Sequence, residues 1–227
     1  TISSCTPSRI SCCCSCSSCT HSAASFTATT SCRRCKSRRR PILLFGQEFW
    51  GGVCGFVSVI HALLLKRGGN ALQGLSQAEL EYNVGLSLLA FLKFIRNNKP
   101  IADEIVAFTQ SFGGVHAKKT IDTLITECEL KIAELTKPKA TGLKKTGEDG
   151  WGIGMTKAAL VAYIQWMGLT CVERPGGMDW TQANLRPYRN CVVGVGNRLD
   201  KGGTYAGLRH WVYVNEAGVM YNWGKET

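Results

Sequence analysis

The chain of 227 residues is long enough for one domain with a substantial hydrophobic core, with or without a tail. It is 44% hydrophobic, but its apolar runs are too interrupted to cross a membrane, which favours a soluble globular protein. The formal net charge of +11 is unevenly placed, because residues 1–40 contain seven Arg or Lys and no Asp or Glu. The remaining residues carry 20 basic and 16 acidic side chains, so nucleic-acid binding by the whole protein is not indicated.

Residues 1–40 are rich in Ser, Thr, Cys and Arg and contain few large apolar side chains. Such a segment cannot bury enough surface to offset the entropy lost on ordering, so we predict a disordered, low-complexity tail. Its basic, acid-free composition is compatible with a transit-like or translocation segment of an exported or secreted protein. Eight of the twelve cysteines lie in this tail, which leaves the body too poor in cysteine for a disulfide scaffold.

Two Cys-x-x-Cys pairs in the tail are separated by twelve residues, at Cys16, Cys19, Cys32 and Cys35. Four thiolates at this spacing could hold a tetrahedral zinc ion. The residues between the pairs are mostly Ser, Thr and Ala, and the surrounding excess of cysteine favours a compositional bias over a placed metal site. We therefore expect no cofactor and keep zinc binding by the tail as a minor alternative.

The body, residues 41–227, is expected to begin with helices. Apolar residues lie nearly all round a helix predicted over residues 54–67, as is typical of a central buried helix. Ser76 and Glu79 have the spacing of a capping box, which opens a second helix running to residue 98. Further helices are predicted over residues 100–112, 121–136 and 156–166. The stretch 76–136 is a long helical insertion that could form one wall of a substrate site.

The second part of the body has the pattern of a sheet. Short β-branched or aromatic segments separated by turn residues predict strands over residues 170–173, 191–195, 211–214 and 219–223. A four-residue hairpin loop over 215–218 would pair Val214 with Val219 and place Trp211 opposite Asn222. The expected fold class is α+β, with an N-terminal helical part packed on a C-terminal antiparallel β-sheet.

Cys54 is the candidate nucleophile. It follows Gly51-Gly52 and begins the first helix, where unpaired N–H groups and the helix dipole favour a thiolate and lower the thiol pKa. The glycines allow a sharp turn and close approach of a substrate backbone. The alternative is a small apolar residue at the start of a buried helix, because cysteine is among the most buried residue types.

A nucleophilic cysteine also needs a base and a group that orients the base. His210 stands at the start of a predicted strand, after a glycine-rich stretch, and is well placed for a cleft. The predicted hairpin makes Asn222 a near neighbour, whose amide oxygen could accept from one imidazole nitrogen and leave the other for the thiol. His61, two helical turns beyond Cys54, is too far along the helix to serve as the base. The alternative is a strand-end histidine and a polar residue near a turn.

With these residues in place, the chain resembles the papain-like cysteine peptidase superfamily, especially its compact bacterial members. The resemblance covers residues 44–227 and rests on Gln47 upstream of Cys54-Gly55, on His210-Trp-Val-Tyr-Val and on Tyr221-Asn-Trp-Gly224. It implies a papain-like fold with the nucleophile Cys54, the general base and acid His210, and the orienting residue Asn222. It also implies an oxyanion hole formed by the Gln47 side chain and the Cys54 backbone N–H.

The resemblance implies a thiol hydrolase that cleaves peptide or amide bonds of a polypeptide substrate through an acyl-enzyme. The same residues would also serve an acyltransferase, a deamidase or a transglutaminase-like enzyme. A rival from another class is a non-catalytic binding module with a Cys-rich tail that binds zinc or nucleic acid. Salt-sensitive binding that depends on residues 1–40 would indicate the rival, and activity that depends on Cys54 would indicate the enzyme.

Overall fold

A computed structural model describes residues 2–4, 49–66, 75–136, 151–174, 187–196, 204–205, 207–222 and 225–226. They all belong to one unit, which comprises residues 1–6 and 42–227, whereas residues 7–41 form a second unit outside the described residues. The predictions for Gln47 and for a zinc site at Cys16, Cys19, Cys32 and Cys35 fall outside the described residues. None of the helices in the described part is long and apolar enough to cross a membrane.

The predicted helices are confirmed to within a few residues at each end. A capping box begins the second helix as expected, since the Ser76 hydroxyl accepts from the Glu79 N–H and the Glu79 carboxylate accepts from the Ser76 N–H at 2.7 Å. The helices are α1 (Cys54–Lys66), α2 (Gln77–Ile95), α3 (Lys99–Gln110), α4 (Ile121–Thr136) and α5 (Lys157–Trp166), with a 3-10 turn η2 (Gly114–His116) between α3 and α4.

The strands form one sheet in the order β2-β1-β3-β4-β5-β6, with antiparallel neighbours throughout. They are β1 (Ile2–Ser4), β2 (Val172–Arg174), β3 (Cys191–Gly196), β4 (Leu208–Val214), β5 (Met220–Asn222) and β6 (Lys225–Glu226). The mixed helix and antiparallel sheet architecture agrees with the predicted α+β class. Ile2–Ser4, at the start of the expected tail, forms β1, which pairs with β2 and β3.

The β4–β5 hairpin differs from its predicted register by one residue. Val214 pairs with Met220 and Tyr213 with Tyr221, rather than Val214 with Val219. The cause is Gly218, whose φ of +84° adds a bulge residue to the turn. The turn is closed by hydrogen bonds from the Asn215 N–H to the Val219 carbonyl at 2.9 Å and from the Gly218 N–H to the Asn215 carbonyl at 3.0 Å.

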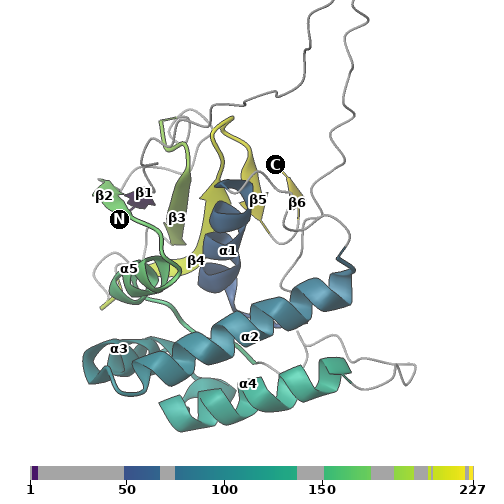
Figure 1. Ribbon diagram of the computed structural model, residues 1–227. Helices are drawn as coiled ribbons and strands as arrows, with labels where there is room; N and C mark the ends of the chain where they lie inside the picture. Colours follow the sequence, from purple (N-terminus) through teal and green to yellow (C-terminus); the bar gives the residue numbers. More distant parts are fainter. Residues whose placement is uncertain are drawn as a thin grey trace, which may run out of the picture. The chain divides into compact units, whose positions relative to one another are not determined.

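Helix α1 is the centre of the fold, as its apolar circumference predicted. It packs against β3, β4 and β5 on one side and against α2 and α5 on another (Figure 1). Phe56 and Val59 are completely buried, and the polar side chains of Ser58 and His61 are buried with them. The N-terminal end of α1, which carries Cys54, therefore lies at the junction between the helical part and the sheet.

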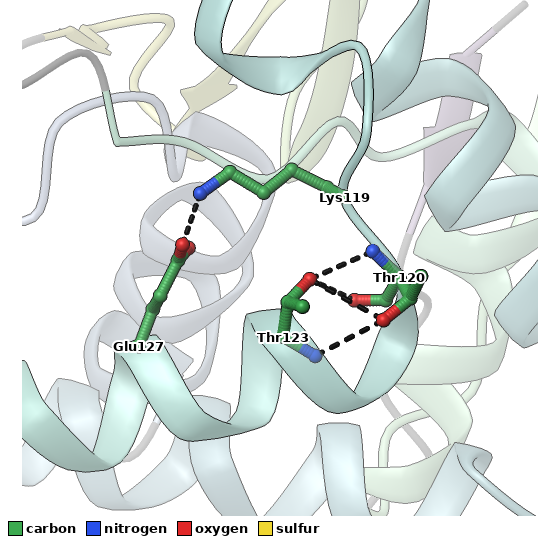
Figure 2. A network of polar contacts seen from close by, with 4 residues as sticks. All are labelled: Lys119, Thr120, Thr123 and Glu127. Atoms are coloured by element: carbon green, nitrogen blue, oxygen red, sulfur yellow. Dashed lines mark hydrogen bonds and ion pairs between the residues drawn. The ribbon is translucent and has the colours of Figure 1, made fainter.

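Helices α2 and α4 lie side by side and form the outer helical layer with α3 (Figure 1). Figure 2 shows how the start of α4 is fixed. The Thr120 N–H donates to the Thr123 hydroxyl at 2.7 Å, and the Thr123 N–H donates to the Thr120 hydroxyl at 3.2 Å. The Lys119 ammonium pairs with Glu127, which lies one turn beyond Thr123 on α4. The Lys119 carbonyl accepts from the Gln110 side chain of α3. These contacts set the position of α4 relative to α3.

Buried His61 makes the fold sensitive to acid. Its side chain is 3% exposed, its ring centroid lies 5.6 Å from that of Tyr221, and burial lowers its pKa to about 4. Since the folded state favours neutral imidazole, its contribution to stability is lost as the pH falls from 6.5 towards 4. We expect about 3 kcal/mol of unfolding free energy to be lost over that range, at roughly 1.4 kcal/mol per pH unit.

Chemical denaturation of the protein and of His61→Phe, measured from pH 7 to pH 4, tests this expectation. Phenylalanine keeps an aromatic ring beside Tyr221 and removes the titrating group. Between pH 6.5 and pH 4, the unfolding free energy of His61→Phe should fall by about 3 kcal/mol less than that of the wild type. Parallel pH curves for the two proteins would contradict the assignment to His61.

Candidate functional site

Cys54 is the first residue of α1, as predicted, and the glycines before it have specific structural uses. Gly51 has a φ of +68°, a conformation that favours glycine. Gly52 forms a parallel bridge with Gly152, in which the Gly52 N–H donates to the Trp151 carbonyl and the Ile153 N–H donates to the Gly52 carbonyl at 3.0 Å. A Cβ on Gly152 would lie 3.2 Å from the Gly52 Cα, so the two backbones approach closely. The entry to α1 is thus fixed by the segment 151–153.

At Gly55, the next residue, the start of α1 packs closely against Met155. A Cβ at Gly55 would lie 2.6 Å from the Met155 Sδ, so this position has no room for a side chain unless Met155 moves. The carbonyl oxygen of Met155 in turn accepts a 2.8 Å hydrogen bond from the Trp211 indole Nε1–H. Three parts of the chain therefore meet around Cys54: the start of α1, the segment 151–156 and strand β4.

Backbone N–H groups of Trp211, Gly55 and Cys54 lie near the Cys54 sulfur and favour its thiolate. These donors lower the thiol pKa, but burial outweighs them and raises the pKa to about 11. The expectation that the helix N-terminus gives Cys54 a lowered pKa is therefore wrong, because desolvation of the anion is the larger effect. At neutral pH Cys54 is a thiol.

His210 and Asn222 meet as the sequence predicted, although through a different register. The His210 Nε2 and the Asn222 Oδ1 are 2.7 Å apart. The observed register places Asn222 opposite Val212, which makes His210 and Asn222 a diagonal pair on one face of the sheet. In the predicted register Asn222 would have faced Trp211 and lain on the other face from His210. The bulge at Gly218 therefore brings the two side chains together.

The environment of His210 keeps its imidazole neutral. Burial lowers the pKa of His210 below its ordinary value, and the hydrogen bond with Asn222 opposes that effect without cancelling it. Because Asn222 presents an amide oxygen, the assigned tautomer carries its proton on Nε2. Proton exchange with a third group would then run through Nδ1. Nδ1 is the ring nitrogen nearer to the main chain of His210.

The structure brings His210 and Asn222 together and places the start of α1, with Cys54, near the neighbouring residue Trp211. The predicted role of Gln47 is left untested, since this residue falls in the part of the chain that is not described. Met155 and Gly152 support the site but were not predicted as site residues. The glycine pattern of the segment Trp151-Gly-Ile-Gly154 signals a close backbone approach, whereas nothing local marks Met155.

No group of three or more His, Cys, Asp or Glu side chains that could hold a metal ion occurs among the described residues. The candidate site offers one thiol, one imidazole held by an amide, and backbone N–H groups near the sulfur. Comparison of the chain with protein-family models, with curated proteins and with solved structures finds no match.

Proposed function

We propose that the protein is a thiol hydrolase that cleaves peptide or amide bonds of a polypeptide substrate, with Cys54 as its nucleophile. The observation that carries the proposal is the 2.7 Å contact between His210 and Asn222, on a strand whose Trp211 backbone N–H lies near the Cys54 sulfur. A nucleophile, a base and a group that orients the base are the parts that covalent acyl transfer requires. The papain-like resemblance of the sequence agrees with this reading and supplies the same roles.

The proposed reaction starts from the neutral pair. As Cys54 Sγ attacks the substrate carbonyl carbon, its proton passes to Nδ1 of His210, and the Asn222 Oδ1 stabilises the resulting imidazolium through Nε2–H. The C–N bond then breaks, and the imidazolium gives its proton to the departing amine. Water, deprotonated by His210, attacks the thioester carbonyl, and the released thiolate regains a proton from His210. Atoms and charges balance over the cycle.

The start of α1 supplies the electrostatic part of the proposed mechanism. Carbonyl attack places negative charge on the substrate oxygen, and the Cys54 backbone N–H at a helix N-terminus is a suitable donor for that charge. We propose the side chain of Gln47 as the second donor, as the resemblance implies. The Gly51-Gly52 turn carries no side chains, so a substrate backbone can approach the thiol from that side.

The proposal is tested with the full chain and fluorescein-labelled casein, with peptide products identified by mass spectrometry. The wild-type protein should release peptides, and Cys54→Ala should reduce the rate to that of the buffer. The matched control is Cys171→Ala, which removes a partly exposed thiol on the sheet side and should leave the rate unchanged. If wild type and Cys54→Ala release peptides equally, or if neither does so across pH 5–10, the hydrolase proposal is wrong.

A further inference from the structure

The helical insertion contacts the segment that leads to Cys54. The indole of Trp50 is completely buried, and its Nε1–H donates to the Glu81 carbonyl of α2 at 2.9 Å. Gly85, one turn further along α2, makes room for the ring, since a Cβ there would lie 2.3 Å from a Trp50 ring carbon. The chain immediately before the Gly51-Gly52 turn therefore packs on helix α2.

Helix α4 contributes Lys131, a lysine that is only 6% exposed. Its Nζ lies 5.5 Å from the ring centroid of Phe49 and 5.4 Å from that of Trp151. These distances are within the range of cation–π attraction, which is stronger when the cation is removed from water. One ammonium group therefore contacts an aromatic ring from each of two chain segments.

The two rings come from the segments that meet beside Cys54. Phe49 lies just before the Gly51-Gly52 turn, and Trp151 immediately precedes Gly152, the bridge partner of Gly52. Trp50 connects the rings, because its centroid lies 5.3 Å from that of Phe49 and 5.6 Å from that of Trp151. A buried charge is costly unless its surroundings compensate it, so a leucine or methionine would be the simpler choice for packing alone.

We propose that Lys131 is a positioning residue, which holds Phe49 and Trp151 together and so fixes the Gly52–Gly152 bridge that places the Cys54 thiol. The inference deepens the proposed hydrolase, and its catalytic meaning rests on that function. The helical insertion, residues 76–136, would thus support the turn that precedes Cys54. Lys131 itself acts through the two rings and touches neither the thiol nor a substrate in this role.

The test follows the Cys54 thiol directly and does not require hydrolysis. Carbamidomethylation of Cys54 by iodoacetamide is measured from pH 7 to pH 12 by mass spectrometry in the wild type and in two variants. Lys131→Met keeps most of the side-chain stem and removes the charge. Lys131→Arg retains a cation that stacks on aromatic rings. The matched control is Lys93→Met on α2, where the lysine is exposed and pairs with Glu129 on the surface.

Loosening of the loop should expose the partly buried thiol further. We expect Lys131→Met to lower the apparent pKa of Cys54 from about 11 towards the ordinary value of 9 and to raise its alkylation rate at pH 8 at least tenfold. Lys131→Arg and Lys93→Met should keep the wild-type profile. Casein hydrolysis by Lys131→Met should fall at least tenfold at a temperature where circular dichroism shows the variant to be folded.

The two readouts separate the failure of this inference from the failure of the proposed function. An unchanged alkylation profile in folded Lys131→Met overturns the positioning role, even if the wild type hydrolyses casein. Absence of hydrolysis in the wild type overturns the hydrolase proposal, while an altered profile would still support the positioning of Cys54 by Lys131. If Lys131→Met does not fold, the alkylation profile of Lys131→Gln at reduced temperature decides, and a wild-type profile in that variant overturns the inference.

Discussion

Replacing His210 by alanine is expected to lower casein hydrolysis by about a hundredfold to ten-thousandfold, the usual contribution of a positioned general base and acid. The raised pKa of Cys54, about 11, makes this loss large at neutral pH, because very little thiolate forms without a base. The residual activity of His210→Ala should rise with pH up to about 11 as the thiolate forms. A variant that keeps more than a tenth of the wild-type rate at pH 7 would exclude His210 as the base.

The pH profile of the wild type should show a plateau around neutral pH. Neutral His210 is the active form in the proposed mechanism. Because burial lowers the pKa of His210, activity should persist below pH 6.5 and fall only as the pH passes the lowered value. Asn222→Ala removes the hydrogen bond that raises this pKa and should move the acid limb to lower pH. It should also reduce the rate, because the ring is no longer held at 2.7 Å from the amide oxygen. His116→Ala, which alters an imidazole in the turn after α3, is the control and should leave both the rate and the limb unchanged.

Replacing Gly85 by alanine is expected to destabilise the fold by about 3 kcal/mol, the upper part of the range for overpacking a core. In an ordinary helix interior the same change stabilises by roughly 1 kcal/mol, because alanine has the higher helix propensity. Here the new Cβ would lie 2.3 Å from a ring carbon of fully buried Trp50 and 2.9 Å from a side-chain carbon of Ile132. The Trp50 ring is rigid and its Nε1–H is held by the Glu81 carbonyl, so the ring cannot move away easily.

Thermal and urea denaturation measure this effect. The melting temperature of Gly85→Ala should fall by roughly 6–12 °C for a domain of this size. Asn83→Ala, at an exposed position of the same helix, is the control and should stabilise slightly. Combining Gly85→Ala with Trp50→Phe should give a smaller penalty for the alanine than in the wild type, because the ring is shorter. A Gly85→Ala protein at least as stable as the wild type would show that the Trp50 ring adjusts freely.

The helices could be predicted because their signals are local. The capping pair Ser76 and Glu79 and the apolar circumference of α1 depend only on neighbours in the sequence. The hairpin register could not be predicted to the residue, since it depends on whether Gly218 joins the turn as a bulge. That single conformational choice decides which face of the sheet carries Asn222.

The candidate site residues Cys54, His210 and Asn222 could be proposed from local context, but their environment could not. The direction of the Cys54 pKa depends on the balance between helix N–H groups and burial, and burial comes from distant segments such as 151–156 and β4. The same holds for Lys131, which the sequence places on an amphipathic helix with no sign that two aromatic rings will cover it. Contacts of this kind are set by tertiary packing and leave no periodic pattern.

The order of the site residues along the chain has a consequence for synthesis. Cys54 is made early, its supports on α4 and in the segment 151–156 follow, and His210 and Asn222 come last. A chain is made at roughly 5–20 residues per second, so the proposed base is made several seconds after the cysteine. In the proposed mechanism, base-assisted attack by the Cys54 thiol therefore begins only when the final hairpin has closed.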